Sequence, residues 1–139
     1  QSCYHISRET ASWAEAAKLC EIHGSRLASI ETDSENQFVK NFLAADRLGK
    51  VWLGGSDFHT EGEWKWSPDE TAFSFTNWHH GQPDNAGKTE NCLAVHRTIK
   101  YEWSDDHCNL QHYYLCEKPD TFYVPTKSCS CGSPICNRC

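Results

Sequence analysis

The sequence predicts a single compact domain in which two helices are followed by short strands. Its 139 residues are typical of one domain that buries its own core. Residues 12–44 carry apolar side chains at helical spacing, whereas residues 51–117 contain short aromatic segments separated by turn-forming residues. Nine cysteines and no methionine indicate a chain that is stabilised by disulfides.

The first predicted helix spans residues 12–23. Its apolar face has members spaced at i, i+3, i+4 and i+7: Trp13, Ala16, Ala17 and Cys20. Ser12 and Glu15 form a capping box that satisfies N–H groups of the first turn, and Gly24 marks the end.

The second predicted helix begins at Thr32 or Ser34 and runs to about Ala44. Its buried face is predicted to consist of three apolar residues: Phe38, Phe42 and Leu43. Strands are predicted after Lys50, at residues 51–54, 63–66, 91–97 and 113–117. Six tryptophans are expected in the core: Trp13, Trp52, Trp64, Trp66, Trp78 and Trp103.

The composition excludes several classes of function. A net charge of −6 and a pI near 5.7 disfavour binding to nucleic acid or to an anionic membrane. No apolar run approaches the roughly 20 residues that span a bilayer, so no membrane insertion is expected. The cysteine content indicates a secreted protein, and we interpret the polar start at Gln1 as the end left by signal-peptide cleavage. No nucleophile–base pair, phosphate-binding loop or HExxH motif occurs, so no enzymatic activity is expected.

The chain changes character after Lys118. Residues 1–118 are therefore assigned to the folded domain, and residues 119–139 to a cysteine-rich tail with few apolar side chains. The tail contains four cysteines: Cys129, Cys131, Cys136 and Cys139. Disulfides are favoured over a zinc site, and the three possible pairings stay open.

Residues of the candidate site lie in and after a long polar loop between Phe73 and Glu90. Loops as long as this one are uncommon and usually have a function. They supply side-chain oxygens, which are the ligands that calcium prefers: Gln82, Asp84, Glu90, Ser104 and Asp105. Any one of these carboxylates could simply be solvated, but the set with this spacing favours a metal site. Four histidines are expected at the surface: His79, His80, His107 and His112.

Several motifs in one order resemble the C-type lectin domain family from Cys3 to Lys118. They are Trp52-Leu53-Gly54-Gly55, Glu61 to Trp66, Asn77-Trp78, Gly81 to Asn85, and Trp103-Ser104-Asp105 three residues before Cys108. Within that family the chain is similar to secreted invertebrate lectins of the perlucin-like, QPD-containing kind. The resemblance implies an α+β double-loop fold, with two helices flanking small antiparallel sheets and a long loop region that binds calcium and sugar.

The resemblance also implies two disulfides, Cys20–Cys116 and Cys92–Cys108, and a set of site residues. The sugar-binding calcium would be held by Gln82, Asp84, Glu90, Ser104 and Asp105. Ser104 stands where the family usually has asparagine, which shortens one ligand. An auxiliary calcium site would use Asp57, Glu61, Asn85 and Asn91.

In this family the Gln82-Pro83-Asp84 motif accompanies galactose-type sugars, so galactose or GalNAc is the expected ligand. Galactose binders often carry a tryptophan for stacking after the motif, and Ala86 occupies that place. Tyr101, His96 or His107 are the candidates for a substitute stacking surface.

The predicted function is calcium-dependent glycan recognition or agglutination in innate immunity. The alternative is a structural or protein-binding module of the same fold, for example in a biomineral matrix or in adhesion. Nine cysteines are an odd number, so at least one pairs outside the chain, stays free or binds something else. Cys3 is the candidate for an intermolecular disulfide, and a disulfide-linked homodimer is expected.

Overall fold

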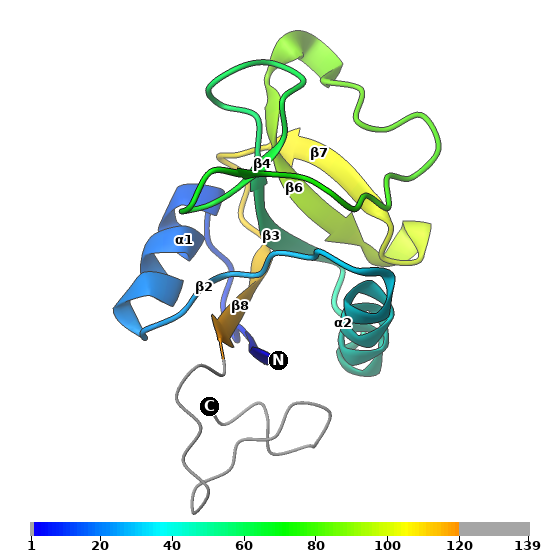
Figure 1. Cartoon of the computed structure of the whole chain (residues 1–139). Coiled ribbons are helices and arrows are strands. Elements are labelled where there is room, and N and C mark those ends of the chain that lie inside the picture. The colour runs from blue at the N-terminus through cyan, green and yellow to red at the C-terminus, as the bar shows by residue number, and fades with distance from the viewer. Residues whose placement is uncertain (1, 120–139) are drawn as a thin grey trace, which may run out of the picture.

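A computed structural model describes residues 2–119 of the chain (Figure 1). The two helices are α1 (Trp13–Ile22) and α2 (Asp33–Asp46). The strands are β1 (Ser2–Ile6), β2 (Arg26–Leu27), β3 (Lys50–Ser56), β4 (Lys65–Trp66), β5 (Thr71–Ala72), β6 (Glu90–His96), β7 (Trp103–His107) and β8 (Tyr113–Pro119). Two short 3₁₀ turns complete the described part, η1 (Ala86–Lys88) and η2 (Arg97–Ile99).

The strands form one mixed sheet. β8 pairs antiparallel with β1 and β2, and this pairing brings the ends of the domain together. β3 pairs antiparallel with β4 and β6, and β6 pairs in turn with β7. The α+β class is confirmed, with one difference from the expected separate antiparallel sheets. A parallel pairing of β3 with β8, through Val51 and Trp52, joins the two halves.

Both helices begin as the sequence predicts. Ser12 caps α1, its side chain accepting from the Glu15 N–H while the Glu15 carboxylate accepts from the Ser12 N–H. Thr32 caps α2 by accepting from the Glu35 N–H. The buried face of α2 differs from the prediction, because Asn36, Val39 and Leu43 are fully buried whereas Phe38 and Phe42 are only partly buried.

The tryptophans form the core, as predicted. Trp52 and Trp103 are 0% exposed, and Trp78 packs partly buried against the core. The Trp13 indole donates to the Leu53 carbonyl at 2.8 Å, which ties α1 to β3. A Cβ at Gly54 would approach the Leu27 carbonyl oxygen to 2.9 Å, so β2 and β3 can lie this close only with glycine there.

Both disulfides implied by the resemblance are present. Cys20 of α1 is bonded to Cys116 of β8, with 5.5 Å between their Cα atoms. Cys92 of β6 is bonded to Cys108, just after β7, at 5.3 Å. Cys3 is buried and disulfide-bonded, so it is not the thiol that the odd count leaves over.

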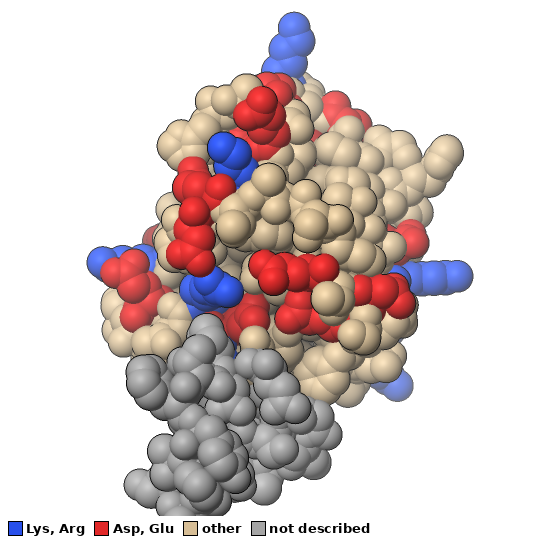
Figure 2. Space-filling model, viewed as in Figure 1, with Lys and Arg blue, Asp and Glu red and all other residues tan. Residues whose placement is uncertain are grey.

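The remaining predictions about the ends of the chain are only partly within reach of the structure. β8 continues through Lys118 to Pro119, and the proposed tail and its cysteine pairings lie outside the described residues. No helix within residues 2–119 is long and apolar enough to cross a membrane. Acidic side chains are widespread on the face shown in Figure 2, in line with the net charge of −6.

Candidate metal and ligand site

The long loop that precedes β6 is anchored by aromatic packing. Phe73, Phe75 and Trp78 each lie with their ring centroid within 6 Å of that of Trp103, at 5.5, 5.9 and 5.8 Å. Main-chain bonds add to this contact, because the Trp103 N–H donates to Asn77 at 2.9 Å and the His79 N–H donates to Trp103 at 2.8 Å. The loop is thereby fixed to β7 two residues before Asp105.

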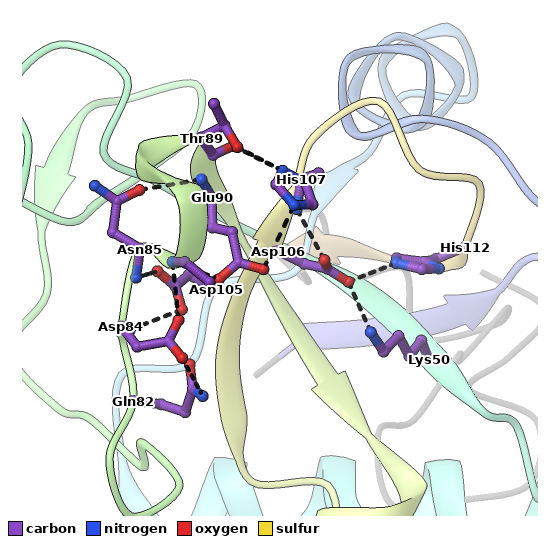
Figure 3. Close-up of polar contacts among 11 residues, drawn as sticks. Lys50, Gln82, Asp84, Asn85, Thr89, Glu90, Asp105, Asp106, His107 and His112 are labelled. Atoms are coloured by element: carbon purple, nitrogen blue, oxygen red, sulfur yellow. Dashed lines mark hydrogen bonds and ion pairs between the residues drawn. The ribbon is translucent and has the colours of Figure 1, made fainter.

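Three carboxylates converge where the loop meets the sheet. Asp84 comes from the loop, Glu90 opens β6 and Asp105 lies on β7 (Figure 3). One oxygen of each lies within 4.8 Å of the others. The antiparallel register of β6 and β7, which places Asp105 opposite Leu93, brings Glu90 and Asp105 to the same end of the hairpin.

Backbone N–H groups hold these three carboxylates in place. Asp105 accepts from the N–H of Asp84 at 3.0 Å and from that of Asn85 at 2.7 Å. The Ala86 N–H donates to both Asp84 and Glu90, at 3.1 and 3.0 Å. The Asn85 side chain accepts from the Glu90 N–H at 3.1 Å and so closes the turn. The loop therefore presents its donors to the carboxylates and orients them toward one point.

The pKa values in the cluster indicate that burial and proximity disfavour three negative charges together. Burial and the neighbouring Asp84 raise the pKa of Glu90 to about 7. The hydrogen bond between Asp84 and Glu90 lowers the pKa of Asp84, so the proton that the pair shares lies on Glu90. Burial raises the pKa of Asp105, against the bonds from the loop N–H groups. A bound cation would favour the ionised form of all three.

Gln82 provides an independent indication that a cation fits here. Its Oε1 is buried and has no hydrogen-bond partner among the described residues, while its Nε2 donates to Asp84 at 3.3 Å. The Gln82–Pro83 bond is cis. Gln82 Oε1 is thus a buried oxygen that receives no hydrogen bond from the described residues. Together with the three carboxylates it makes an all-oxygen set of ligands, which is the kind that suits calcium. Ser104 is half-buried next to Asp105 on β7, and its predicted role as a ligand stays a prediction.

The predicted auxiliary site is brought together only in part. Asp57 is buried after β3, and the Asn91 amide, turned with its nitrogen toward the acids, donates to Asp57 at 3.1 Å and Glu61 at 3.2 Å. The contact with Asp57 raises the pKa of Glu61. Asn85 instead serves the three-carboxylate cluster through Glu90. An amide thus occupies the position between two acids that a cation could take.

Two of the three proposed stacking residues, Tyr101 and His96, lie away from the cluster. Tyr101 is 5% exposed, and its hydroxyl donates to the Leu48 carbonyl at 2.6 Å, so it offers no ring face to a sugar at the cluster. His96 is at the other end of β6 and contacts Thr98. His107 is the candidate that lies beside the cluster, with its Nε2 3.9 Å from Glu90 and its Nδ1 2.9 Å from the Thr89 hydroxyl.

A polar trio centred on the buried Asp106, next to the site, was not predicted. Asp106 accepts from Lys50 Nζ and contacts His112 Nε2, both at 2.9 Å (Figure 3). Burial acts to raise the pKa of Asp106, but the bonds from His112 and Lys50 outweigh it and hold that pKa well below its ordinary range. The side chain of His112 is only 12% exposed, which corrects the expectation of a surface histidine. The sequence signal for this trio was the doublet Asp105-Asp106. Because adjacent residues of a strand face opposite sides, Asp106 had to point away from the side that Asp105 faces and so needed partners of its own.

The fold and the cluster define a disulfide-linked α+β domain whose long loop and adjoining strands bring side-chain oxygens together. A profile of the "Lectin C-type domain" matches residues 9–118. Perlucin from Haliotis laevigata is 41% identical over 122 residues, which cover 85% of this chain and 77% of that protein. The chain belongs to the C-type lectin domain family, which is non-enzymatic, as the absence of catalytic motifs predicted.

Solved structures agree with this assignment. The C-type lectin CEL-I from Cucumaria echinata superposes with a TM-score of 0.77 and 27% identity, covering 84% of this chain and 89% of that one. Herring type II antifreeze protein superposes with a TM-score of 0.76 and 33% identity, covering 85% and 91%. The same fold therefore occurs in one protein named a lectin and in another named an antifreeze protein.

Proposed function

We propose that the chain is a calcium-dependent carbohydrate-binding lectin whose sugar site is the three-carboxylate cluster. The observation that carries the proposal is the convergence of Asp84, Glu90 and Asp105 within 4.8 Å. The unpartnered oxygen of Gln82 and the family membership support it. Ser104 is included as a further ligand on the strength of its place beside Asp105.

The residues around the cation would both hold it and recognise the sugar. Bound calcium supplies open coordination positions that two neighbouring sugar hydroxyls can fill. Gln82 Nε2 can donate to one hydroxyl, whereas the carboxylates of Asp84 and Glu90 accept from them. The Ala86 N–H, which donates to the carboxylates of both Asp84 and Glu90, keeps these acceptors oriented before the sugar arrives.

We infer a galactose or GalNAc preference from the order of donor and acceptor across Pro83. An amide at Gln82 and a carboxylate at Asp84 place the donor and acceptor in one order, and exchanging them would favour a sugar whose hydroxyls point the other way. Ala86 provides no ring for the apolar face of the sugar. His107, beside Glu90, is the ring best placed to do so.

A glycan array run with calcium and then with chelator tests the proposal. We expect retention on galactosyl or GalNAc glycans that chelator removes and that Asp84→Ala abolishes. Glu21→Gln is the matched control, because it removes one negative charge on α1, where the side chain is 74% exposed. Absence of any chelator-sensitive glycan signal would overturn the proposal.

Localisation and valency follow from the cysteines. We infer secretion, because at least two disulfides need an oxidising compartment. Single lectin sites bind weakly, so a covalent homodimer would supply avidity for recognition or agglutination of glycan-bearing cells in innate immunity. Cys3 is already bonded, so a bridge between subunits would use a cysteine among residues 120–139. Non-reducing electrophoresis distinguishes the dimer from a monomer near 16 kDa.

The alternative is a structural or protein-binding module, as in a biomineral matrix or adhesion. The antifreeze protein of the same fold and the serine at position 104 favour it. Asp84→Ala separates the two functions: a lectin loses its glycan, whereas a module that binds protein without calcium keeps its partner.

A further inference from the structure

A hollow lies on the domain between α2 and η2, apart from the three-carboxylate cluster. It has a volume of about 540 Å³, within the range of small-molecule sites. Four cations line it together with two amides: Lys40, Arg47, Arg97, Lys100, Gln37 and Asn41. The chain has only 13 lysines and arginines and a net charge of −6, so four cations around one hollow is an unusual concentration.

The cations are brought together by the ends of two elements. Gln37 shares a face of α2 with Lys40 and Asn41, three and four residues later. Arg47 follows α2 with a left-handed φ of 54°, and Lys100 follows η2 with a φ of 57°. The left-handed residues Arg47 and Lys100 terminate α2 and η2, and both residues line the same hollow.

The walls of the hollow are fixed to each other. The Arg97 N–H donates to the Gly49 carbonyl at 2.8 Å, which ties the start of η2 to the segment after α2. Tyr101 is buried at the hollow, and its hydroxyl donates to the Leu48 carbonyl at 2.6 Å. Tyr101, which lies away from the three-carboxylate cluster, is therefore part of the wall of this hollow.

The cations are not fully neutralised by neighbours. Within residues 2–119, neither the two lysines nor the two arginines of the hollow take part in an ion pair. The nearby acids are Asp46 and Glu102. The hydrogen bond with His79 lowers the pKa of Glu102, and Lys40 and Lys100 contribute to lowering it. Four positive charges against two acids leave a net positive hollow on an acidic protein.

We propose that this hollow binds the oxyanion substituent of an acidic glycan, a sulfate ester or a uronate carboxylate. Planar guanidinium groups of Arg47 and Arg97 suit two-oxygen contacts, and the lysines and amides add donors. Glu90 and Arg97 lie at opposite ends of β6, roughly 20 Å apart at strand spacing, so the two sites are distinct. The choice of a glycan as carrier rests on the proposed lectin function.

A sparsely charged glycan fits better than nucleic acid. Acidic side chains are widespread on the face shown in Figure 2, the chain has a net charge of −6, and Asp84, Glu90 and Asp105 lie on the same domain. A densely charged polymer would be repelled wherever it left the hollow. A glycan whose acidic groups are far apart can place one of them in the hollow and keep uncharged sugars against the rest of the surface, which avoids this repulsion.

Binding of the full chain to immobilised chondroitin sulfate, chemically desulfated chondroitin and uncharged dextran tests the proposal in chelator. We expect binding to chondroitin sulfate and none to dextran. Loss on desulfation assigns the sulfate as the bound group, and full retention assigns the carboxylate. Because chelator removes any calcium-dependent binding from this assay, failure here is distinguishable from failure of the calcium site.

Charge variants locate the interaction. Arg97→Gln and Arg47→Gln are each expected to weaken binding about threefold or more, and together more than about tenfold. Arg8→Gln is the matched control at an exposed position outside the hollow and should have no effect. Equal losses in Arg8→Gln and Arg97→Gln, no binding to either chondroitin, or preferential binding of single-stranded DNA through the same arginines would each overturn the proposal.

Discussion

The main-chain N–H of Asp84 donates to a carboxylate oxygen of Asp105 at 3.0 Å, across 21 residues of sequence. This bond joins the tip of the long loop to the middle of β7. Because both residues are themselves candidate ligands, the same contact orders the loop and places two of three carboxylates. It also makes Asp105 the residue on which both calcium binding and loop order depend.

Asp105→Asn should therefore impair more than one property. We expect calcium affinity to fall by at least about tenfold, since affinity depends on the number of charged ligands. The loop N–H groups of Asp84 and Asn85 lose a charged acceptor, which costs about 1–3 kcal/mol of stability. Calorimetric calcium titration and denaturant unfolding measure the two effects. Glu21→Gln serves as control, and wild-type calcium affinity in Asp105→Asn would contradict the assignment.

The pKa of Glu90, raised to about 7, predicts that calcium competes with a proton. Between pH 8 and pH 6 the apparent calcium affinity should fall about tenfold, because one carboxylate must lose its proton to act as a ligand. Calcium titrations at several pH values, with proton release measured in buffers of different ionisation enthalpy, check this.

Without calcium the same group makes stability depend on pH. A carboxyl whose folded-state pKa is raised contributes stability below its ordinary value of 4.5 that is lost as pH rises through about 7. Asp105, whose pKa burial raises, acts in the same direction. Thermal unfolding in chelator should give a melting temperature that declines from pH 5 to pH 8, less so in Glu90→Gln. A profile that does not decline over this window would contradict the buried, proton-sharing cluster.

Removing the Cys92–Cys108 bridge should destabilise the domain. The bridge closes a loop of 16 residues, which corresponds to about 3 kcal/mol in the chain-entropy account. Denaturant unfolding of the Cys92→Ala, Cys108→Ala double variant under non-reducing conditions measures this loss. We also expect weaker calcium binding, because Cys92 lies two residues after Glu90. An unchanged unfolding midpoint would show that strand pairing alone holds β6 and β7.

Asp106→Asn should destabilise the fold by about 2 kcal/mol, since it removes a buried charge that accepts from the largely buried His112 and from Lys50, whose side chain is 36% exposed. The pKa of Asp106 is held below its ordinary value of 3.8, so its contribution is present above that value and is lost as pH falls below it. Denaturant unfolding at pH 7 and pH 3 should show a smaller difference in the variant. Asp69→Asn removes an exposed ion pair with Arg26 and should cost less than about 1 kcal/mol.

Local chemistry made the helices predictable, whereas the strands were harder to find. Ser12 and Thr32 cap their helices with their own side chains, so their starts are evident in the sequence. β2 and β5 have two residues each and exist only because a partner strand lies beside them. β7 has the polar sequence Trp103 to His107, which carries no apolar alternation to predict it.

The sequence by itself determined which ligand atoms this protein can offer. The oxygens of Gln82, Asp84 and Glu90 lie within one loop and its exit, so local chain geometry is enough to bring them together. Only the tertiary structure decided which residues meet. Asp105 reaches the loop through the β6–β7 register, and Tyr101 is buried beside Leu48 rather than exposed to sugar. Contacts between residues far apart in sequence depend on how elements pack, and local pattern does not encode that packing.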